Sequence, residues 1–277
     1  MALVRRDWPS AEARGTIVIV HGLGEHIGRY AHVAARLNAN RWSVVGYDQR
    51  GHGASPGERG RIAAGDDLLA DLGAVVDAVR AEAPGPLVVL GHSLGGLVVA
   101  RFVAGALESR RPSWQRDVDA LVLSSPALAI GMTGAKRALL ATLEALTPNL
   151  GIGNGLDATG ISRDPAVVAA YRADPLVHDR IAPRLVRFLA DAGPTVLALA
   201  PRWQVPTLLL YAGSDRLVVP AGSAEFAAAA PAAVVTPRPF AALFHEIFNE
   251  PEQDEVLGVL TAWLDTLTLT PTTRSPR

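Results

Sequence analysis

Leu87-Val88-Val89-Leu90-Gly91-His92-Ser93-Leu94-Gly95-Gly96 is the stretch of sequence that decides the fold. Its first four residues are typical of a buried strand, and the apolar run over 94–107 predicts a helix. The Gly91-x-Ser93-x-Gly95 pattern between them indicates a turn so tight that a Cβ atom at either glycine would collide with neighbouring backbone. A strand, a strained turn with a central serine, and a helix form a nucleophile elbow. Ser93 is therefore the predicted nucleophile.

Composition limits the classes of protein to consider. The chain has 277 residues, enough for one large α/β domain with an insertion, and 49% of them are hydrophobic. The formal net charge is −1 and no basic run is present, so we expect no nucleic-acid partner. Cysteine is absent, which removes disulfides, thiolate metal sites and a cysteine nucleophile. The oligomeric state is not indicated by any pattern.

The start of the chain does not have the pattern of an export signal. Arg5, Arg6 and Asp7 stand where a signal peptide needs an apolar segment. No apolar run reaches the roughly 18 residues that a membrane span requires. We therefore expect a cytoplasmic protein, with peripheral contact to a membrane as the alternative to a purely aqueous location.

Short β-branched runs alternate with helical patterns on both sides of the opening stretch. The predicted strands are 3–8, 16–20, 43–47, 87–90, 120–124, 207–211 and 234–235, the first of them at an edge. Helical spacing of apolar residues covers 30–37, 68–79, 94–107 and 256–264. This alternation predicts an α/β fold with a mostly parallel sheet and helices on both of its faces.

One segment breaks the alternation. Residues 129–203 are apolar and helical in pattern, and they stand between two predicted sheet strands. We expect them to form a helical cap over the carboxyl ends of the strands, where open α/β sheets bind ligands. An ordinary pair of connecting helices is the alternative. The expected division is a core of residues 1–128 and 204–265, a cap of residues 129–203, and a disordered tail of residues 266–277 that is rich in Thr, Pro, Arg and Ser.

A serine nucleophile needs a base and an acid that orients the base. On α/β sheets of this kind the acid and then the histidine follow the serine along the chain. Asp215 comes just after the strand predicted at 207–211, although a solvated turn aspartate would look the same. Of the seven histidines, only His245 follows Asp215, and it stands in a loop between the last strand and the last helix. These two residues complete the predicted triad.

The oxyanion of such a reaction needs two N–H donors. The backbone N–H of Leu94 directly follows the nucleophile and begins a helix, and the glycine-bearing loop after the strand at 16–20 supplies the N–H of Leu23. His21, Glu25 and His26 suggest a zinc motif, but their spacing is one residue too long and the glycines interrupt the necessary helix. The sequence therefore predicts no metal and no cofactor.

Five strings carry a resemblance to a known family: His21 to Tyr30 (HGLGEHIGRY), Asp48 to Ser55 (DQRGHGAS), Gly91 to Gly96 (GHSLGG), Gly213 to Asp215 (GSD) and His245 to Glu250 (HEIFNE). Together they resemble the monoacylglycerol lipase / lysophospholipase group of the α/β-hydrolases. The resemblance implies an α/β-hydrolase fold with a helical cap. It also implies the triad Ser93, Asp215 and His245 and the donors Leu23 and Leu94.

The resemblance further implies a function and a substrate site. The chain is expected to hydrolyse monoacylglycerols to glycerol and free fatty acid through an acyl-enzyme, with a lipid ester as partner and transient contact between the cap and a membrane surface. Glu25 and Arg29 would shape the polar floor near the glycerol headgroup, or else form a structural ion pair that holds the loop. Members of the group begin with another strand and turn before the stretch that resembles residues 3–8, and this chain departs from them there.

Other functions remain open on the sequence. A lysophospholipase or a general carboxylesterase would use the same triad. A ligand-binding pseudoenzyme would keep the fold without the chemistry. An apolar cap favours medium or long acyl chains over acetate, because each buried methylene contributes about 0.8 kcal/mol.

Overall fold

β-branched and leucine-rich runs form the central sheet of the computed structural model, which describes residues 1–131 and 133–268. Its seven strands lie in the order β1-β3-β2-β4-β5-β8-β9. All neighbouring pairs are parallel except β1 and β3. The strands are β1 (Arg5–Trp8), β2 (Thr16–Val20), β3 (Ser43–Tyr47), β4 (Leu87–His92), β5 (Ala120–Ser124), β8 (Thr207–Ala212) and β9 (Val235–Phe240). The predicted α/β fold with a mostly parallel sheet is confirmed.

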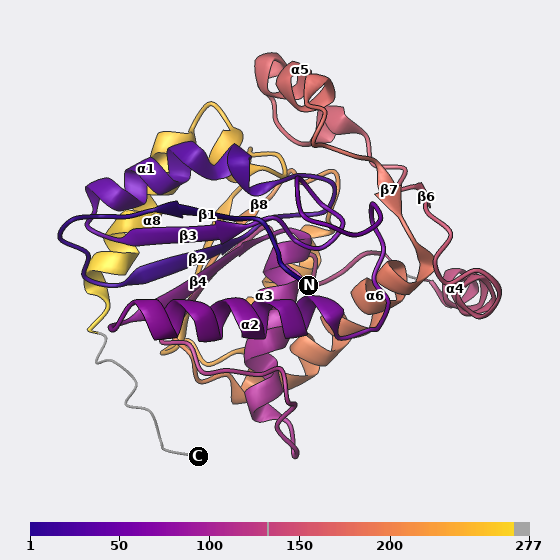
Figure 1. Ribbon diagram of the computed structural model, residues 1–277, viewed down its shortest axis with the longest axis horizontal. Helices are drawn as coiled ribbons and strands as arrows, with labels where there is room; N and C mark the ends of the chain where they lie inside the picture. The colour runs from indigo at the N-terminus through magenta and orange to yellow at the C-terminus, as the bar shows by residue number, and fades with distance from the viewer. Residues whose placement is uncertain (132, 269–277) are drawn as a thin grey trace.

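Helices cover both faces of this sheet (Figure 1). One face carries α1 (Ala31–Ala39) and α8 (Gln253–Thr266). The other carries α2 (Asp67–Glu82), α3 (Leu94–Ala104), α6 (Pro183–Leu199) and α7 (Pro220–Ala229). The single helix expected over 94–107 is α3 followed by the 3-10 turn η2 (Gly105–Leu107).

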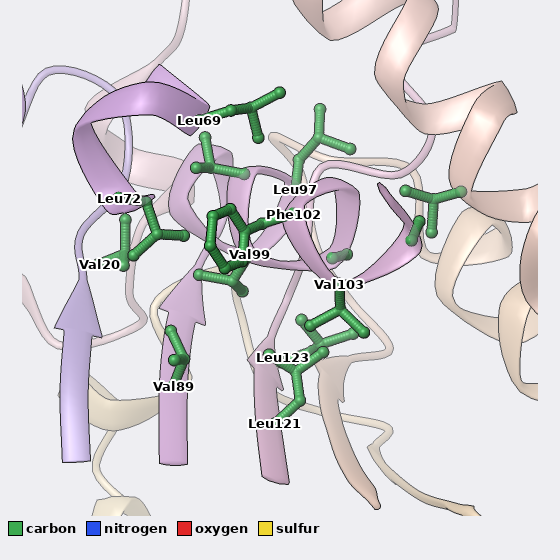
Figure 2. Close-up of a cluster of buried hydrophobic side chains, with 14 of the residues drawn as sticks. Val20, Leu69, Leu72, Val89, Leu97, Val99, Phe102, Val103, Leu121 and Leu123 are labelled. Carbon is green, nitrogen blue, oxygen red and sulfur yellow. The ribbon is translucent and has the colours of Figure 1, made fainter. Parts of the chain in front are cut away.

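Two hydrophobic cores result, one on each side of the sheet. Val18 and Val20 of β2 point into the core under α2 and α3, whereas Ile17 and Ile19 point into the core under α1 and α8. All four side chains are fully buried, as the unbroken β-branched run predicts for a strand covered on both faces. Figure 2 shows part of the first core, in which Val103 of α3 lies toward Leu121 and Leu123 of β5, and Phe102 lies toward Leu72 of α2.

The edge strands differ in character from the central ones. β1 pairs antiparallel with β3 and forms one edge. β9 forms the other edge and extends to Phe240, further than the expected 234–235, although it contains Pro237 and Pro239. An edge strand tolerates proline because one side of it forms no ladder hydrogen bonds. Pro237 and Pro239 are the reason why the strand predicted from the sequence is shorter than β9.

The segment between β5 and β8 extends away from the sheet. It contains α4 (Gly134–Leu146), β6 (Ile152–Gly153), η3 (Ala158–Gly160), α5 (Pro165–Ala173), β7 (Arg180–Ile181), α6 and η4 (Ala200–Arg202), and β6 pairs with β7. In Figure 1 α4 and α5 stand well apart from the sheet, while α6 runs along its helical layer. Leu185 and Val196 of α6 belong to the buried core with α3. The outlying part of the segment is therefore α4 through β7.

Two further expectations concern the C-terminal tail and membrane-spanning helices. Within the expected tail, Thr266 is the last residue of α8, and residues 269–277 lie outside the described residues. Over residues 1–131 and 133–268, no helix combines the length and apolar character that crossing a bilayer requires.

Candidate active site

Ser93 lies at the junction of β4 and α3, and its backbone has a strained conformation imposed by the tight turn. Its φ is 54° and its ψ is −118°, a conformation that costs a non-glycine residue on the order of 1–3 kcal/mol. The turn is held from both sides, because Ser93 N donates to Ser124 O at 2.9 Å and Ser93 O accepts from Ala127 N at 3.0 Å. The structure thus contains the strained elbow that the sequence predicts.

The two flanking glycines are required by close backbone contacts. A Cβ on Gly91 would stand 2.4 Å from the carbonyl oxygen of Gly95. A Cβ on Gly95 would stand 2.1 Å from the carbonyl oxygen of Val20. Neither obstacle is a side chain that could rotate away. The expected reason for glycine on each side of Ser93 is confirmed.

Asp215 and His245 meet at the ends of β8 and β9. His245 Nδ1 donates to Asp215 Oδ2 at 2.6 Å, and the two side chains are only 6% and 3% exposed. Asp215 Oδ1 accepts from the backbone N–H groups of Leu217 and Val218, at 2.8 and 2.9 Å. Burial works to raise the pKa of Asp215, but the hydrogen bond and charge of His245 and these two N–H groups outweigh it and lower the pKa. Asp215 is therefore ionised and fixes the Nδ1 tautomer of His245.

Ser93 and His245 share one cavity. It encloses about 340 Å³ and is also lined by Leu23, Glu25 and Glu246, a size within the range of small-molecule sites. Asp215 lies behind His245, on the side away from this cavity's lining. The predicted nucleophile and base thus line the same cavity, and Nε2 of His245 makes no hydrogen bond to a described residue.

The two expected oxyanion donors lie beside the elbow. Leu94 begins α3, so its N–H has no intrahelical acceptor. Leu23 lines the cavity, and within the described residues neither of these two N–H groups makes a backbone hydrogen bond. The loop of Leu23 packs closely on the elbow, since a Cβ on Gly22 would stand 3.2 Å from Ser93 Cβ. Both N–H groups thus lack a backbone acceptor among the described residues, and their role as oxyanion donors stays a prediction.

Glu25 and Arg29 differ in how they face the cavity. Glu25 lines it, whereas Arg29 is absent from its described lining. The Arg29 guanidinium carbon lies 4.8 Å from the ring centroid of Tyr171, which belongs to α5 and lines the cavity itself. Arg29 Nη1 donates to Glu25 Oε2 at 2.7 Å. Thus an ion pair forms, and Tyr171 packs on its arginine.

His92, which directly precedes Ser93 in the chain, is close to His245. Its ring centroid lies 4.8 Å from that of His245, and its Nδ1 is 3.0 Å from Ser124 Oγ. Burial, followed by the neighbouring His245, lowers the pKa of His92 to about 3. His92 is therefore neutral at physiological pH and is a poor proton acceptor beside His245.

Cap residues are attached directly to the loop of His245. Glu246 N donates to Ile161 O at 2.8 Å, and Ser162 Oγ donates to Asn249 O at 2.9 Å. Arg163 Nε donates to Oε2 of Glu250, whose side chain is fully buried. These attachments could not be predicted from the sequence, because their partners are 85 or more residues apart. Only the pair of Arg163 and Glu250 consists of residue types that suggest an interaction.

A second attachment joins the cap to the loop of Leu23. His178 N donates to Gly24 O at 2.9 Å, and His26 Nε2 lies 2.8 Å from Asp174 Oδ2. A Cβ on Gly24 would stand 2.3 Å from His178 O, so the close approach requires glycine there. The segment between β5 and β8 is thus hydrogen-bonded to the loop of His245 and to the loop of Leu23. In the part of the chain that the structure describes, no three His, Cys, Asp or Glu side chains form a group able to hold a metal ion.

Comparison with known proteins places this geometry in a family. The family model described as "Serine aminopeptidase, S33" (Hydrolase_4) matches residues 11–252. The chain belongs to this family. A monoacylglycerol lipase of Mycolicibacterium smegmatis is 38% identical to this S33-family chain, over 92% of the chain and 90% of that protein. The expected resemblance to the monoacylglycerol lipase group is confirmed.

Two further relatives of this S33-family member cover nearly all of it. Phospholipase YtpA of Bacillus subtilis is 29% identical over 93% of the chain and 98% of that protein. The crystal structure of the Paleococcus ferrophilus monoacylglycerol lipase superposes with a TM-score of 0.83 at 35% identity, covering 95% of this chain and 98% of that one. These comparisons support the α/β-hydrolase fold over nearly the whole of this family member.

Proposed function

We propose that this chain is a carboxylic ester hydrolase that cleaves monoacylglycerols to glycerol and free fatty acid through an acyl-enzyme. The observation that carries the proposal is the 2.6 Å hydrogen bond between His245 and buried Asp215, with His245 and the strained Ser93 lining the same cavity. The family and the relatives named as monoacylglycerol lipases support the same reaction. In this proposal Ser93, Asp215 and His245 are the catalytic triad.

The proposed reaction has two halves. Ser93 Oγ attacks the ester carbonyl carbon while His245 Nε2 takes the hydroxyl proton, and Asp215 stabilises the imidazolium. The N–H groups of Leu23 and Leu94 bind the oxyanion. The carbonyl re-forms, the bond to glycerol breaks, and His245 returns the proton to the departing oxygen. Water then repeats the attack on the acyl group, with the same proton transfers, and releases the fatty acid.

Charge on the cavity wall favours a neutral headgroup. Five carboxylates (Glu25, Asp157, Asp174, Asp179 and Glu246) line the cavity. Three guanidinium groups (Arg29, Arg172 and Arg180) pair with four of them, so five negative charges face three positive ones and the wall keeps a negative excess. A phosphate ester entering this cavity would be repelled, whereas glycerol hydroxyls can donate to carboxylate oxygens. Glu25 is the proposed contact for those hydroxyls, and Arg29 supports it from behind. This feature favours a monoacylglycerol over a lysophospholipid.

Apolar side chains of the cap are proposed to bind the acyl chain and the surface from which it comes. Residues 129–203 are the proposed cap, and its Leu156, Ile161 and Val177 line the cavity. Large apolar side chains that do not line the cavity are exposed on α4 and the segment after it, namely Leu139, Leu146, Leu150 and Ile152. Contiguous exposed apolar side chains mark interaction surfaces. We therefore propose transient contact between this part of the cap and a lipid surface, and a cytoplasmic location stays a prediction.

A kinetic panel tests the proposed substrate. It compares kcat/KM for 1-monoacylglycerols of increasing chain length, a lysophosphatidic acid with the same acyl chain, a short-chain ester and an aminoacyl anilide. We expect kcat/KM to rise with chain length, and the lysophosphatidic acid to react at least about tenfold more slowly, a loss of roughly 1.4 kcal/mol. Faster turnover of the lysophosphatidic acid, the acetate ester or the anilide would contradict the proposal.

Two variants, measured in the same panel, test whether charge or shape selects the headgroup. Asp157 and Asp179 have side chains that are both 72% exposed, so Asp157→Asn and Asp179→Asn should fold normally. Each variant should lower the ratio of kcat/KM for monoacylglycerol to kcat/KM for lysophosphatidic acid. Added salt should lower the same ratio in the wild-type protein. A preference that neither change affects would mean that shape, and not charge, selects the headgroup.

A further inference from the structure

Glu246, the residue after His245, is held in place by Arg29 from a distant part of the chain. Arg29 Nη1 donates to Glu246 Oε1 at 2.6 Å, and Nη2 donates to Glu246 Oε2 at 2.7 Å. The two residues are 217 positions apart, and their side chains are 12% and 6% exposed. Two parallel hydrogen bonds of this kind fix the planes of both groups. Asn249 Nδ2 adds a third bond to Oε2 at 2.9 Å.

The same guanidinium holds the loop of the proposed oxyanion donor. Arg29 Nη1 also donates to Glu25 Oε2 at 2.7 Å. The other oxygen of Glu25 accepts from Gly22 N at 2.6 Å and from the Tyr30 hydroxyl at 2.7 Å. Gly22 immediately precedes Leu23 in the loop after β2. A continuous chain of hydrogen bonds therefore runs from that loop, through Glu25 and Arg29, to Glu246 beside His245.

The charges in this chain are stable in the folded protein. Burial works to raise the pKa of Glu25, but the positive charge of Arg29 and lesser contributions from His92, His21 and the Gly22 N–H hold it at about 2. Burial works to lower the pKa of Arg29, and its hydrogen bonds to Glu246 and the charges of Glu246 and Glu25 raise it. Arg29 is thus the single cation between two carboxylates that otherwise would repel each other.

We propose that Arg29 and Glu246 are positioning residues that set the separation between the oxyanion donor Leu23 and the base His245. The inference rests on the proposed function, since it takes the catalytic roles of Leu23 and His245 from there. The physical reason is that these two groups must act on one carbonyl, yet they come from loops after β2 and β9, at different places in the sheet. A displacement of about 1 Å between such groups can cost a hundredfold in rate.

The positioning role of Arg29 requires a guanidinium group, and another cation would not replace it. A lysine at position 29 would keep the positive charge but lose the planar fork that binds both oxygens of Glu246 and also reaches Glu25. Arg29→Lys therefore separates charge from geometry. Glu246→Gln keeps the shape of the side chain but removes the charge that the fork binds.

The test measures kcat and KM of both variants on a monoacylglycerol, with Arg50→Lys as the matched control. Arg50 makes a similar two-bond pair with Asp71, at 2.6 and 2.7 Å, and is 18% exposed. Its partner Asp71 lies in α2 and does not line the cavity, whereas both carboxylates bound by Arg29 do. We expect Arg29→Lys and Glu246→Gln to lower kcat about ten- to a hundredfold with KM within about threefold of wild type. Arg50→Lys should keep the wild-type kcat.

A third background tests whether Arg29 transmits the effect. If the two loops are joined through Arg29, then adding Glu246→Gln to the Arg29→Met variant should lower kcat little further, so that the two losses are not additive. Full additivity, a wild-type kcat in Glu246→Gln, or an equal loss in Arg50→Lys would overturn the inference. If a variant at position 29 fails to fold, the near-isosteric Glu246→Gln decides alone. Absence of ester hydrolysis in both wild type and Arg50→Lys would instead refute the proposed function.

Discussion

The backbone at Ser93 links the fold to the proposed chemistry at the scale of one residue. β4 delivers the chain to the elbow, and the contacts of Gly91 and Gly95 leave no room for a relaxed turn. Ser93 consequently keeps a φ of 54° and a ψ of −118°. Glycine adopts such a conformation without the steric cost that other residues bear. The strain in Ser93 is thus a property of the position, separate from its hydroxyl.

Replacing Ser93 by glycine or by alanine tests this strain. Both variants lose the hydroxyl, but only glycine relieves the backbone, so we expect Ser93→Gly to be more stable than Ser93→Ala by about 1 kcal/mol. Ser124 in the regular strand β5 is the control, where the glycine variant should be the less stable of the two by about 0.5–1 kcal/mol. Chemical denaturation measures both pairs. The same order at both positions would show that the elbow holds no strain.

The sequence allowed Ser93, Asp215 and His245 to be predicted because each lies in a turn or loop after a predicted strand, in the chain order that the fold requires. Glu246 was not predicted, although it stands beside His245. Its partner Arg29 is 217 residues away, and nothing local distinguishes a clamped glutamate from a solvated one. For Glu25 and Arg29, only the structure could show that one faces the cavity and the other supports it.

At the scale of elements, the inserted segment has two kinds of helix that look alike in sequence. Both α4 and α6 are amphipathic. The apolar face of α6 packs in the core with α3, whereas Leu139 and Leu146 of α4 are 60% and 75% exposed. Hydrophobic spacing predicts a helix but not the surface that will cover it. The sequence therefore suggested a uniform cap, and the structure separates a packed helix from an outlying one.

The exposed side of α4 should govern binding to a lipid surface. Leu146→Gln should weaken the partition of the protein into neutral phospholipid vesicles about tenfold, because a buried leucine side chain contributes about 1.5–3 kcal/mol. Val4→Gln is the control, since Val4 is 40% exposed but lies outside the cap. Sedimentation with vesicles measures the partition. Equal losses for both variants, or none for Leu146→Gln, would contradict contact through α4.

At the scale of the whole molecule, histidines make the free energy of unfolding depend on pH. Burial is the main cause of a lowered pKa for four of them, His21, His52, His92 and His178, to about 3 for His92 and about 4 for His178. In the unfolded chain a histidine titrates near pH 6.5. Below that pH the unfolded chain therefore binds protons that these side chains in the folded protein do not.

The free energy of unfolding should accordingly fall as the pH is lowered from about 6.5 toward 4, by up to about 1.4 kcal/mol per pH unit for each histidine. Urea denaturation between pH 7.5 and 4.5 measures the slope. His178→Gln should reduce that slope by one proton, because an amide does not titrate. A free energy of unfolding that is constant across this range would mean that the four histidines are not held neutral by burial.

Transient acylation of Ser93 is the central claim, and pre-steady-state hydrolysis of a p-nitrophenyl ester tests it most directly. We predict a burst of about one p-nitrophenolate per protein chain. Mass spectrometry of the quenched reaction should find the acyl group on the peptide that contains Ser93, and Ser93→Ala should show neither the burst nor the adduct. A burst of wild-type amplitude in Ser93→Ala, or an acyl group on another residue, would contradict the account.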